Sequence, residues 1–151
     1  MRAWCCGEKG EDKTVKAQVE EINHLIDCAF SKTPTDEKER LLEFRAYLAG
    51  PRQAVESLLF VYNAKHFLNN KQTSKEEREQ QIQQMCDIFL RPDSTFPVNL
   101  NGTLAQSLRS HVRDADAFAA DLIDAQNELV RLLMEPYRDW CKLKRGRSRR
   151  G

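Results

Sequence analysis

The sequence predicts an all-α fold, an irregular bundle of about seven helices of unequal length. Hydrophobic residues recur at intervals of three and four along most of the 151 positions, which is the spacing of one helix face. The chain contains only 6 glycines and 5 prolines while 31% of its residues are charged, a composition that suits helices joined by short polar links. No segment repeats at a fixed period, which argues against a stack of repeated units.

The first two predicted helices are bounded by turn residues. The first extends from about residue 14 to residue 30, and the second begins near Asp36, where Glu39 completes a capping-box pattern. The second helix ends at Gly50 and Pro51, because glycine allows a left-handed turn and proline cannot continue a helix. The apolar stripe of the first helix consists of Val15, Val19, Ile22, Ile26 and Ala29.

The third predicted helix, from residue 53 to about residue 68, is apolar on more than one face. Val55, Leu58, Leu59 and Tyr62 form one stripe, and Phe60, Ala64 and Phe67 form another. A helix that is apolar on most sides is normally surrounded by its neighbours, so we expect this helix at the centre of the core.

In the middle of the chain, capping residues indicate where the helices begin. Ser74 begins a fourth helix, which ends at Arg91-Pro92. Residues 91–101 contain two prolines and no helical period, so we expect an ordered loop or an extended segment there. Thr103 and Gln106 form another capping box, which opens a short helix through residue 112.

A long helix and a final helix complete the predicted bundle. Asp114 or Asp116 caps the long helix, whose apolar positions continue to Leu132. Pro136 either closes that helix or begins the next one. The apolar face of the final helix contains Tyr137 and Trp140.

Several function classes are excluded by the sequence. The longest apolar runs are a few residues, far short of the roughly 20 that cross a bilayer, and no signal-peptide pattern is visible. The five cysteines are an odd number without a C-x-x-C pair, which fits a reducing compartment, so we expect a cytoplasmic protein.

No motif for catalysis or for a cofactor is present. Neither common pattern of a phosphate-binding glycine loop occurs. His24 and Cys28 share one helical face, but no further ligand is placed near them, so packing is favoured over metal binding. His66 and His111 are isolated from any nucleophile motif. We therefore expect a binding protein, not an enzyme, with no cofactor, no metal and no small-molecule substrate.

Basic residues are concentrated at the C-terminal end of the sequence, and two adjacent cysteines lie near its N-terminal end. Six of the 24 basic residues lie in the last ten positions, and two interpretations remain open for residues 144–151: a solvated tail, or a segment attracted to anionic lipid. Nucleic acid is not expected, because no aromatic residues are interleaved. Residues 1–12 are predicted to be flexible, with Cys5 and Cys6 as candidates for S-acylation such as palmitoylation. Acylation and the basic tail together would anchor the chain at the cytosolic face of the plasma membrane.

Three ordered segments resemble the regulator-of-G-protein-signalling (RGS) family. Residues 44–48 (FRAYL) and 56–60 (ESLLF) are similar to the family's F-x-x-F-L and E-N-ψ-x-F-W, where ψ is apolar. Residues 97–101 (PVNLN) resemble its V-N-L/I stretch. Residues 125–126 (AQ) and 133–140 (LMEPYRDW) resemble its A-Q, L-M and S-Y-x-x-F ending. Their order and spacing agree with the helical pattern.

The resemblance implies a two-lobed bundle of about nine helices over residues 13–143, whose loops at one end bind the Gα subunit of a heterotrimeric G protein. It also implies accelerated GTP hydrolysis, because Gα carries its own catalytic arginine and glutamine, and a partner need only stabilise the switch segments in the transition state. A tenfold to hundredfold acceleration requires only ~1.4 to 2.7 kcal/mol. The implied Gα-binding residues are Glu56, Ser57, Asn99, Asn101, Leu133, Met134, Glu135, Tyr137 and Arg138.

Each residue that matches a family contact also has a purely structural interpretation. Asn99 matches the family asparagine that meets the switch region near the catalytic glutamine, although an asparagine here can instead hold its own turn with Pro97. Glu56 matches an acidic contact, or is a plain helix carboxylate. Leu133 and Met134 match an apolar edge of the site, or belong to the core.

Three departures from the family pattern support an alternative function. Ser57 replaces a second asparagine, Glu135-Pro136 shorten an acidic step, and Asp139 stands at an often basic position. Losing a charged contact at a buried interface costs ~2 to 5 kcal/mol, as much as the catalytic effect itself. The alternative is a divergent RGS-like scaffold or a membrane-associated interaction module without GTPase-activating activity.

Overall fold

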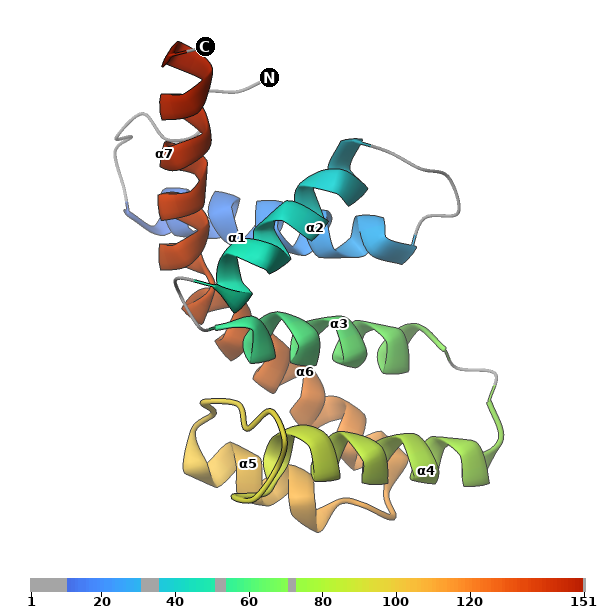
Figure 1. Cartoon of the computed structure of the whole chain (residues 1–151). Helices are drawn as coiled ribbons and strands as arrows, with labels where there is room; N and C mark the ends of the chain where they lie inside the picture. Colours follow the sequence, from blue (N-terminus) through green and yellow to red (C-terminus); the bar gives the residue numbers. More distant parts are fainter. Residues whose placement is uncertain (1–10, 31–35, 51–53, 71–72, 151) are drawn as a thin grey trace. The chain divides into compact units, whose positions relative to one another are not determined.

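A computed structural model of the chain describes residues 11–30, 36–50, 54–70 and 73–150 (Figure 1). This part of the chain contains seven α-helices and no strand, which confirms the all-α prediction. The helices are α1 (Glu11–Asp27), α2 (Asp36–Ala49), α3 (Val55–Asn69), α4 (Lys75–Met85), α5 (Gly102–Ser110), α6 (Ala115–Leu132) and α7 (Met134–Arg150). A 3-10 turn, η1 (Cys28–Phe30), follows α1, and a π-helical segment, η2 (Cys86–Leu90), follows α4.

The chain is divided into two compact units. The terminal unit is formed by both ends of the chain, residues 1–53 and 130–151, and contains α1, α2 and α7. The central unit is formed by residues 54–129 and contains α3, α4, α5 and almost all of α6.

The core of the terminal unit is built around aromatic rings from α2 and α7. The ring of Phe44 meets the ring of Tyr137 edge-on at 5.4 Å between centroids, and it lies 5.2 Å from the Trp140 ring. Ile22 and Ile26, from the predicted stripe of α1, are also buried in this unit. Burial of these large side chains contributes about 1.5–3 kcal/mol each, so α7 depends on α1 and α2 for its position.

Helix α3 supplies the largest share of the core of the central unit, as its two apolar stripes predict. The ring of Phe60 lies edge-on to Phe89 of η2 at 5.4 Å, and the ring of Phe67 lies edge-on to Phe118 of α6 at 5.7 Å. The buried apolar residues of α3 are Leu58, Phe60, Val61, Ala64 and Phe67.

Two of the predicted helix caps are confirmed and one is wrong. The Ser74 hydroxyl accepts a hydrogen bond from the backbone N–H of Glu77 at 3.2 Å, and Asp114 accepts one from Ala117 at 3.2 Å. Helix α5, however, begins at Gly102 and is capped by Asn101, whose side-chain oxygen accepts from the N–H of Thr103 at 2.8 Å. Thr103 is therefore inside the helix that it was expected to cap.

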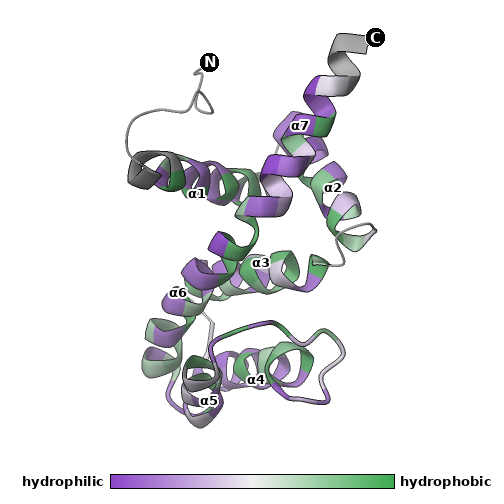
Figure 2. Ribbon diagram, turned by 90° about the vertical axis from the view of Figure 1, so that its left-hand side faces the viewer, coloured by the Kyte–Doolittle hydropathy of each residue, from purple (hydrophilic) through white to green (hydrophobic). Residues whose placement is uncertain are grey.

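The final helix is longer than predicted. It begins at Met134, so Pro136 lies in the first turn, where its missing N–H removes no intrahelical hydrogen bond. It continues through Arg150, so residues 144–150, the predicted basic tail, are helical. Lysine and arginine are good helix formers and are favoured at a helix C-terminus, which explains the extension. After Trp140 the helix is mostly hydrophilic (Figure 2).

Candidate functional site

The predicted contact residues are divided between the two units. Glu56, Ser57, Asn99 and Asn101 belong to the central unit. Leu133, Met134, Glu135, Tyr137 and Arg138 belong to the terminal unit. Cys5 and Cys6, the predicted acylation positions, lie outside the described residues.

Residues 91–101, called the 91–101 loop below, form the ordered loop that the sequence predicts. The backbone N–H of Phe96 donates to the carbonyl of Ile88 at 3.0 Å, and that of Val98 donates to the carbonyl of Phe89 at 3.1 Å. These two bonds hold the far side of the loop against η2. The loop therefore has a fixed position within the central unit.

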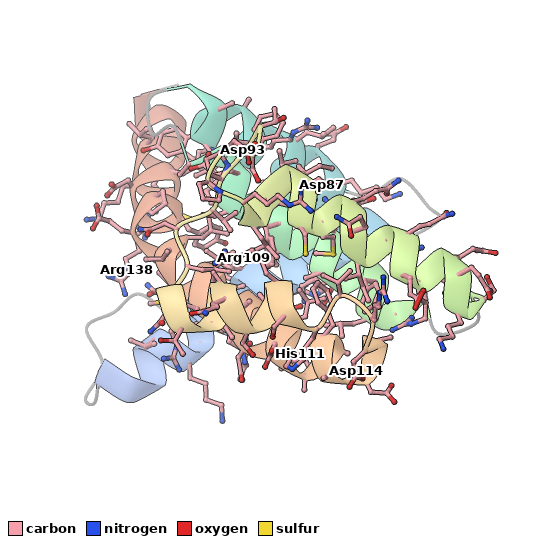
Figure 3. All side chains as sticks on the ribbon, turned by 90° about the horizontal axis from the view of Figure 1, so that it is seen from below. Asp87, Asp93, Arg109, His111, Asp114 and Arg138 are labelled. Atoms are coloured by element: carbon pink, nitrogen blue, oxygen red, sulfur yellow. The ribbon has the colours of Figure 1, made fainter. Side chains whose placement is uncertain are left out.

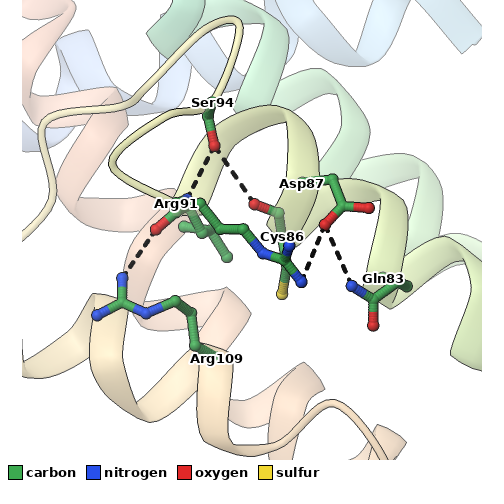
Figure 4. A network of polar contacts seen from close by, with 7 residues as sticks. Gln83, Cys86, Asp87, Arg91, Ser94 and Arg109 are labelled. Atoms are coloured by element: carbon green, nitrogen blue, oxygen red, sulfur yellow. Dashed lines mark hydrogen bonds and ion pairs between the residues drawn. The ribbon is translucent and has the colours of Figure 1, made fainter.

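Side chains fasten the near side of the loop as well (Figure 4). The Ser94 hydroxyl accepts from the backbone N–H of Arg91 at 2.8 Å and lies 3.5 Å from the carbonyl of Cys86, to which it donates. The guanidinium of Arg109, on α5, donates to the carbonyl of Leu90 at 2.8 Å. That carbonyl is at the end of η2, so Arg109 satisfies an acceptor that has no helical partner.

The π-helical segment η2 is the feature next to the loop that the sequence did not reveal. It buries Cys86, Phe89 and Leu90, while Ile88 is 39% exposed. Burial raises the pKa of the Cys86 thiol, so this thiol stays protonated and acts as a small apolar side chain. π-helical turns are frequent at functional sites, and this one sets the direction in which the loop leaves α4.

Asn99 lies at the centre of a three-residue turn in the loop. The backbone N–H of Leu100 donates to the carbonyl of Val98 at 3.1 Å, so the main chain closes the turn without help from a side chain. The Asn99 side chain is exposed, and its amide makes no hydrogen bond with any described residue. The alternative in which this amide holds the turn is therefore not supported by the described contacts.

The other predicted residues of the central unit have structural roles. Asn101 uses its side chain to cap α5, and its backbone N–H donates to Glu128 of α6 at 2.7 Å. Glu56 is half-buried in the first turn of α3, where a carboxylate is favoured by the helix dipole. Ser57 is only 6% exposed, so the prediction that it contacts a partner is corrected.

Burial also corrects the predictions for the terminal unit. Leu133 and Tyr137 are fully buried, and Met134 is 7% exposed, so these side chains belong to the core. The Tyr137 hydroxyl donates to Glu21 at 2.7 Å, and burial together with this hydrogen bond raises the pKa of Tyr137. A partner cannot reach these groups while the helices are packed.

Glu135 and Arg138 are the exposed members of the terminal set. The Nε of Arg138 donates to the side-chain oxygen of the buried Gln18 at 2.7 Å. Arg138 is thus attached to α1 through one nitrogen of its guanidinium, and the remaining N–H groups point away from that bond.

One polar cluster between α5 and α6 was missed from the sequence. A single oxygen of Asp121, Oδ2, accepts from the Ser107 hydroxyl at 2.6 Å and lies 2.9 Å from Nδ1 of His111. His111 and Asp114 occupy the link between these helices (Figure 3). Serine and histidine both bond to the same carboxylate and not to each other, so the histidine cannot take the serine proton as a nucleophile would require. The cluster joins the two helices.

The described residues contain no group of three His, Cys, Asp or Glu side chains that could hold a metal ion. Within the same residues, no helix is both long enough and apolar enough to cross a bilayer. The sulfur of Cys28 lies 3.8 Å from Nε2 of His24, a contact between neighbouring turns of one helical stretch.

No protein-family model, no curated protein and no solved structure matches the chain.

Proposed function

We propose that this chain is an RGS-type regulator that docks on an activated Gα subunit, accelerates GTP hydrolysis there and so terminates the signal. The observation that carries the proposal is the state of Asn99. Its amide is exposed, has no hydrogen bond to a described residue, and stands on a loop that is fastened on both sides. The same position matches the family asparagine that meets the switch region.

An amide of this kind has the chemistry that the role requires. It can donate and accept at the same time, and so it can contact the Gα glutamine that orients the attacking water and a neighbouring backbone group. Because the loop is already fixed by Ser94 and Arg109, little conformational entropy is lost on binding. The protein would act by stabilising the switch segments in their transition-state arrangement, and Gα would supply the catalytic groups.

The architecture supports the same proposal. The described part of the chain contains seven helices, where the resemblance implies about nine, and the chain is divided into a unit made from both of its ends and a unit made from its middle. This division is compatible with the two lobes that the resemblance implies. The proposed place of action is the cytosolic face of the plasma membrane, with Cys5 and Cys6 as candidate acylation sites.

A non-catalytic scaffold is the second candidate, and specific observations favour it. The side chain of Ser57 is buried, that of Asn101 is used as a helix cap, and those of Leu133 and Tyr137 are in the core. The surface that remains for Gα therefore has fewer contacts than the resemblance implies. Such a protein could bind Gα, or another partner, without changing the hydrolysis rate.

Single-turnover GTP hydrolysis by several Gα subunits, with and without the full chain, tests the proposal. We expect at least about tenfold acceleration, which corresponds to ~1.4 kcal/mol. Asn99→Ala should lower the acceleration at least about tenfold and leave the free energy of unfolding within about 0.5 kcal/mol. The matched control is Asn127→Ala, which removes another exposed amide of the central unit and should change neither quantity.

Two results would contradict the proposal. One is the absence of acceleration by any Gα subunit at protein concentrations well above micromolar. The other is an equal loss of acceleration in Asn99→Ala and Asn127→Ala. A pull-down that compares Gα in its transition-state mimic with Gα bound to GDP then separates the candidates, because equal binding to both forms supports the scaffold.

A further inference from the structure

The final helix, α7, has two halves with opposite surroundings. Its first half packs in the terminal unit through Tyr137 and Trp140, which are 0% and 5% exposed. Beyond Trp140 the side chains of Lys142, Leu143 and Arg145 are exposed, Leu143 by 48%. Figure 2 shows mostly hydrophilic colouring in the outer part of α7 that precedes its grey end.

The outer half of α7 carries a concentrated positive charge. Between positions 142 and 150 there are six lysines and arginines and no acidic residue. The helix continues through Arg150, and Lys142, Lys144 and Arg145 are its basic residues with described side chains. A run of basic residues without an acidic one is attracted to an anionic surface.

A contact with α2 holds this half of the helix in a defined position. The Nζ of Lys144 lies 2.9 and 3.0 Å from the two carboxylate oxygens of Glu43, and it lies 5.5 Å from the centroid of the Trp140 ring. Glu43 of α2 therefore forms an ion pair with Lys144 of α7. Lys142 and Arg145, two positions before and one position after Lys144, are exposed.

We infer that the outer half of α7 is a docking surface for anionic phospholipid headgroups. Each lysine or arginine held at an acidic leaflet strengthens binding about fivefold, and the exposed Leu143 adds an apolar side chain that can enter the headgroup boundary. Single-stranded nucleic acid is less suitable, because the described part of this segment exposes no aromatic ring on which a base could stack. This surface needs no Gα subunit, so its test is independent of the proposed function.

Vesicle co-sedimentation of the full chain tests the inference. The probes are vesicles of neutral phosphatidylcholine and vesicles in which about a third of the lipid is phosphatidylserine. We expect the partition coefficient to be at least about tenfold larger on the anionic vesicles, and to fall when the salt concentration is raised, because exposed charges are then screened.

Charge-reversal variants locate the surface. Lys142→Glu with Arg145→Glu should lower binding to anionic vesicles at least about twentyfold. The matched control, Lys75→Glu with Arg113→Glu, changes the net charge equally at exposed positions of the central unit, and should lower binding no more than about threefold. Circular dichroism checks that helix content is kept, and Lys142→Gln with Arg145→Gln replaces the reversal pair if it is not.

Three outcomes would overturn the inference. The first is equal binding to neutral and anionic vesicles, or no binding to either. The second is an equal loss of binding in the α7 pair and the control pair. The third is tighter binding to a labelled oligonucleotide than to anionic vesicles at the same salt concentration, with the oligonucleotide binding lost in the α7 pair, which would assign the surface to nucleic acid.

Discussion

Replacing Tyr137 by phenylalanine removes one oxygen atom from the core of the terminal unit and keeps its aromatic contacts. The ring of Tyr137 lies 5.4 Å from Phe44 and 5.9 Å from Trp140, and phenylalanine can make both contacts. What is lost is the hydrogen bond of 2.7 Å from the hydroxyl to Glu21, together with the side-chain hydrogen bond between Tyr137 and Cys141. A hydrogen bond to a charged group contributes about 1.5–3 kcal/mol, so Tyr137→Phe should lower the free energy of unfolding by about that amount at pH 7.

The pH dependence gives this prediction a second, independent part. Burial and the hydrogen bond to Glu21 hold the pKa of Tyr137 above its ordinary value of 10.0 in the folded chain. Above pH 10 the unfolded chain therefore releases this proton and the folded chain keeps it, so the unfolded state is favoured as pH rises. The stabilisation is complete below pH 10 and is lost above it, by up to about 1.4 kcal/mol per pH unit. The gap between wild type and Tyr137→Phe should close over that range.

Urea denaturation followed by circular dichroism, at pH 7 and at steps up to pH 11, measures both parts. Tyr47→Phe is the matched control, because Tyr47 is half-buried on α2 and its hydroxyl makes no hydrogen bond with a described residue. It should change the free energy of unfolding by less than about 0.5 kcal/mol. The reasoning is refuted if the two variants are equally stable at pH 7, or if the gap for Tyr137→Phe is as wide at pH 11 as at pH 7.

Two further substitutions test the central unit by the same denaturation assay. Asp114→Ala removes the cap of α6 and should lower the free energy of unfolding by about 1 kcal/mol. Asp116→Ala, in the first turn of the helix, should lower it by only a few tenths of that amount. Arg109→Met leaves the Leu90 carbonyl without its donor and should cost about 1.5–3 kcal/mol, with faster amide exchange in the 91–101 loop. The exposed Arg113→Met is its control, and equal effects of the two would remove Arg109 as the anchor of the loop.

Most of the helices could be predicted because their apolar residues recur at the helical period, but two boundaries depend on contacts that a local pattern cannot contain. The capping pattern favours Thr103, yet Asn101 caps α5 because its backbone N–H is fixed by Glu128, 27 positions away. The π-helical segment Cys86–Leu90 likewise has no local signal. Its geometry depends on Phe60, Ser94 and other partners that are distant in sequence.

The candidate site was predictable only in part. For two of its residues, however, the helical spacing of the apolar positions already indicates burial. Ser57 is three and four positions before Phe60 and Val61, so it shares their buried face. Leu133 stands in the same relation to Tyr137. A position matched to a family contact must therefore also be exposed by its own helical register. Asn99 lies in a loop, so no helical period predicts whether it is exposed. Only the loop geometry shows that its amide is available.

Under the proposed function, the energy that Asn99 can supply predicts different effects on the hydrolysis rate and on the affinity for Gα. Each hydrogen bond of its amide contributes about 0.5–1.5 kcal/mol, and two such bonds made only in the transition state would supply about 1–3 kcal/mol. This is the range that a tenfold to hundredfold acceleration requires. Ser57, Leu133 and Tyr137 are buried, so under the proposal they add no contacts to the affinity for Gα. Their absence from the surface should therefore weaken binding more than it slows saturated hydrolysis. When the hydrolysis rate of Gα is measured against the concentration of this protein, the full acceleration should be reached only at high concentration. An acceleration that saturates at low concentration and remains below about tenfold would contradict this expectation.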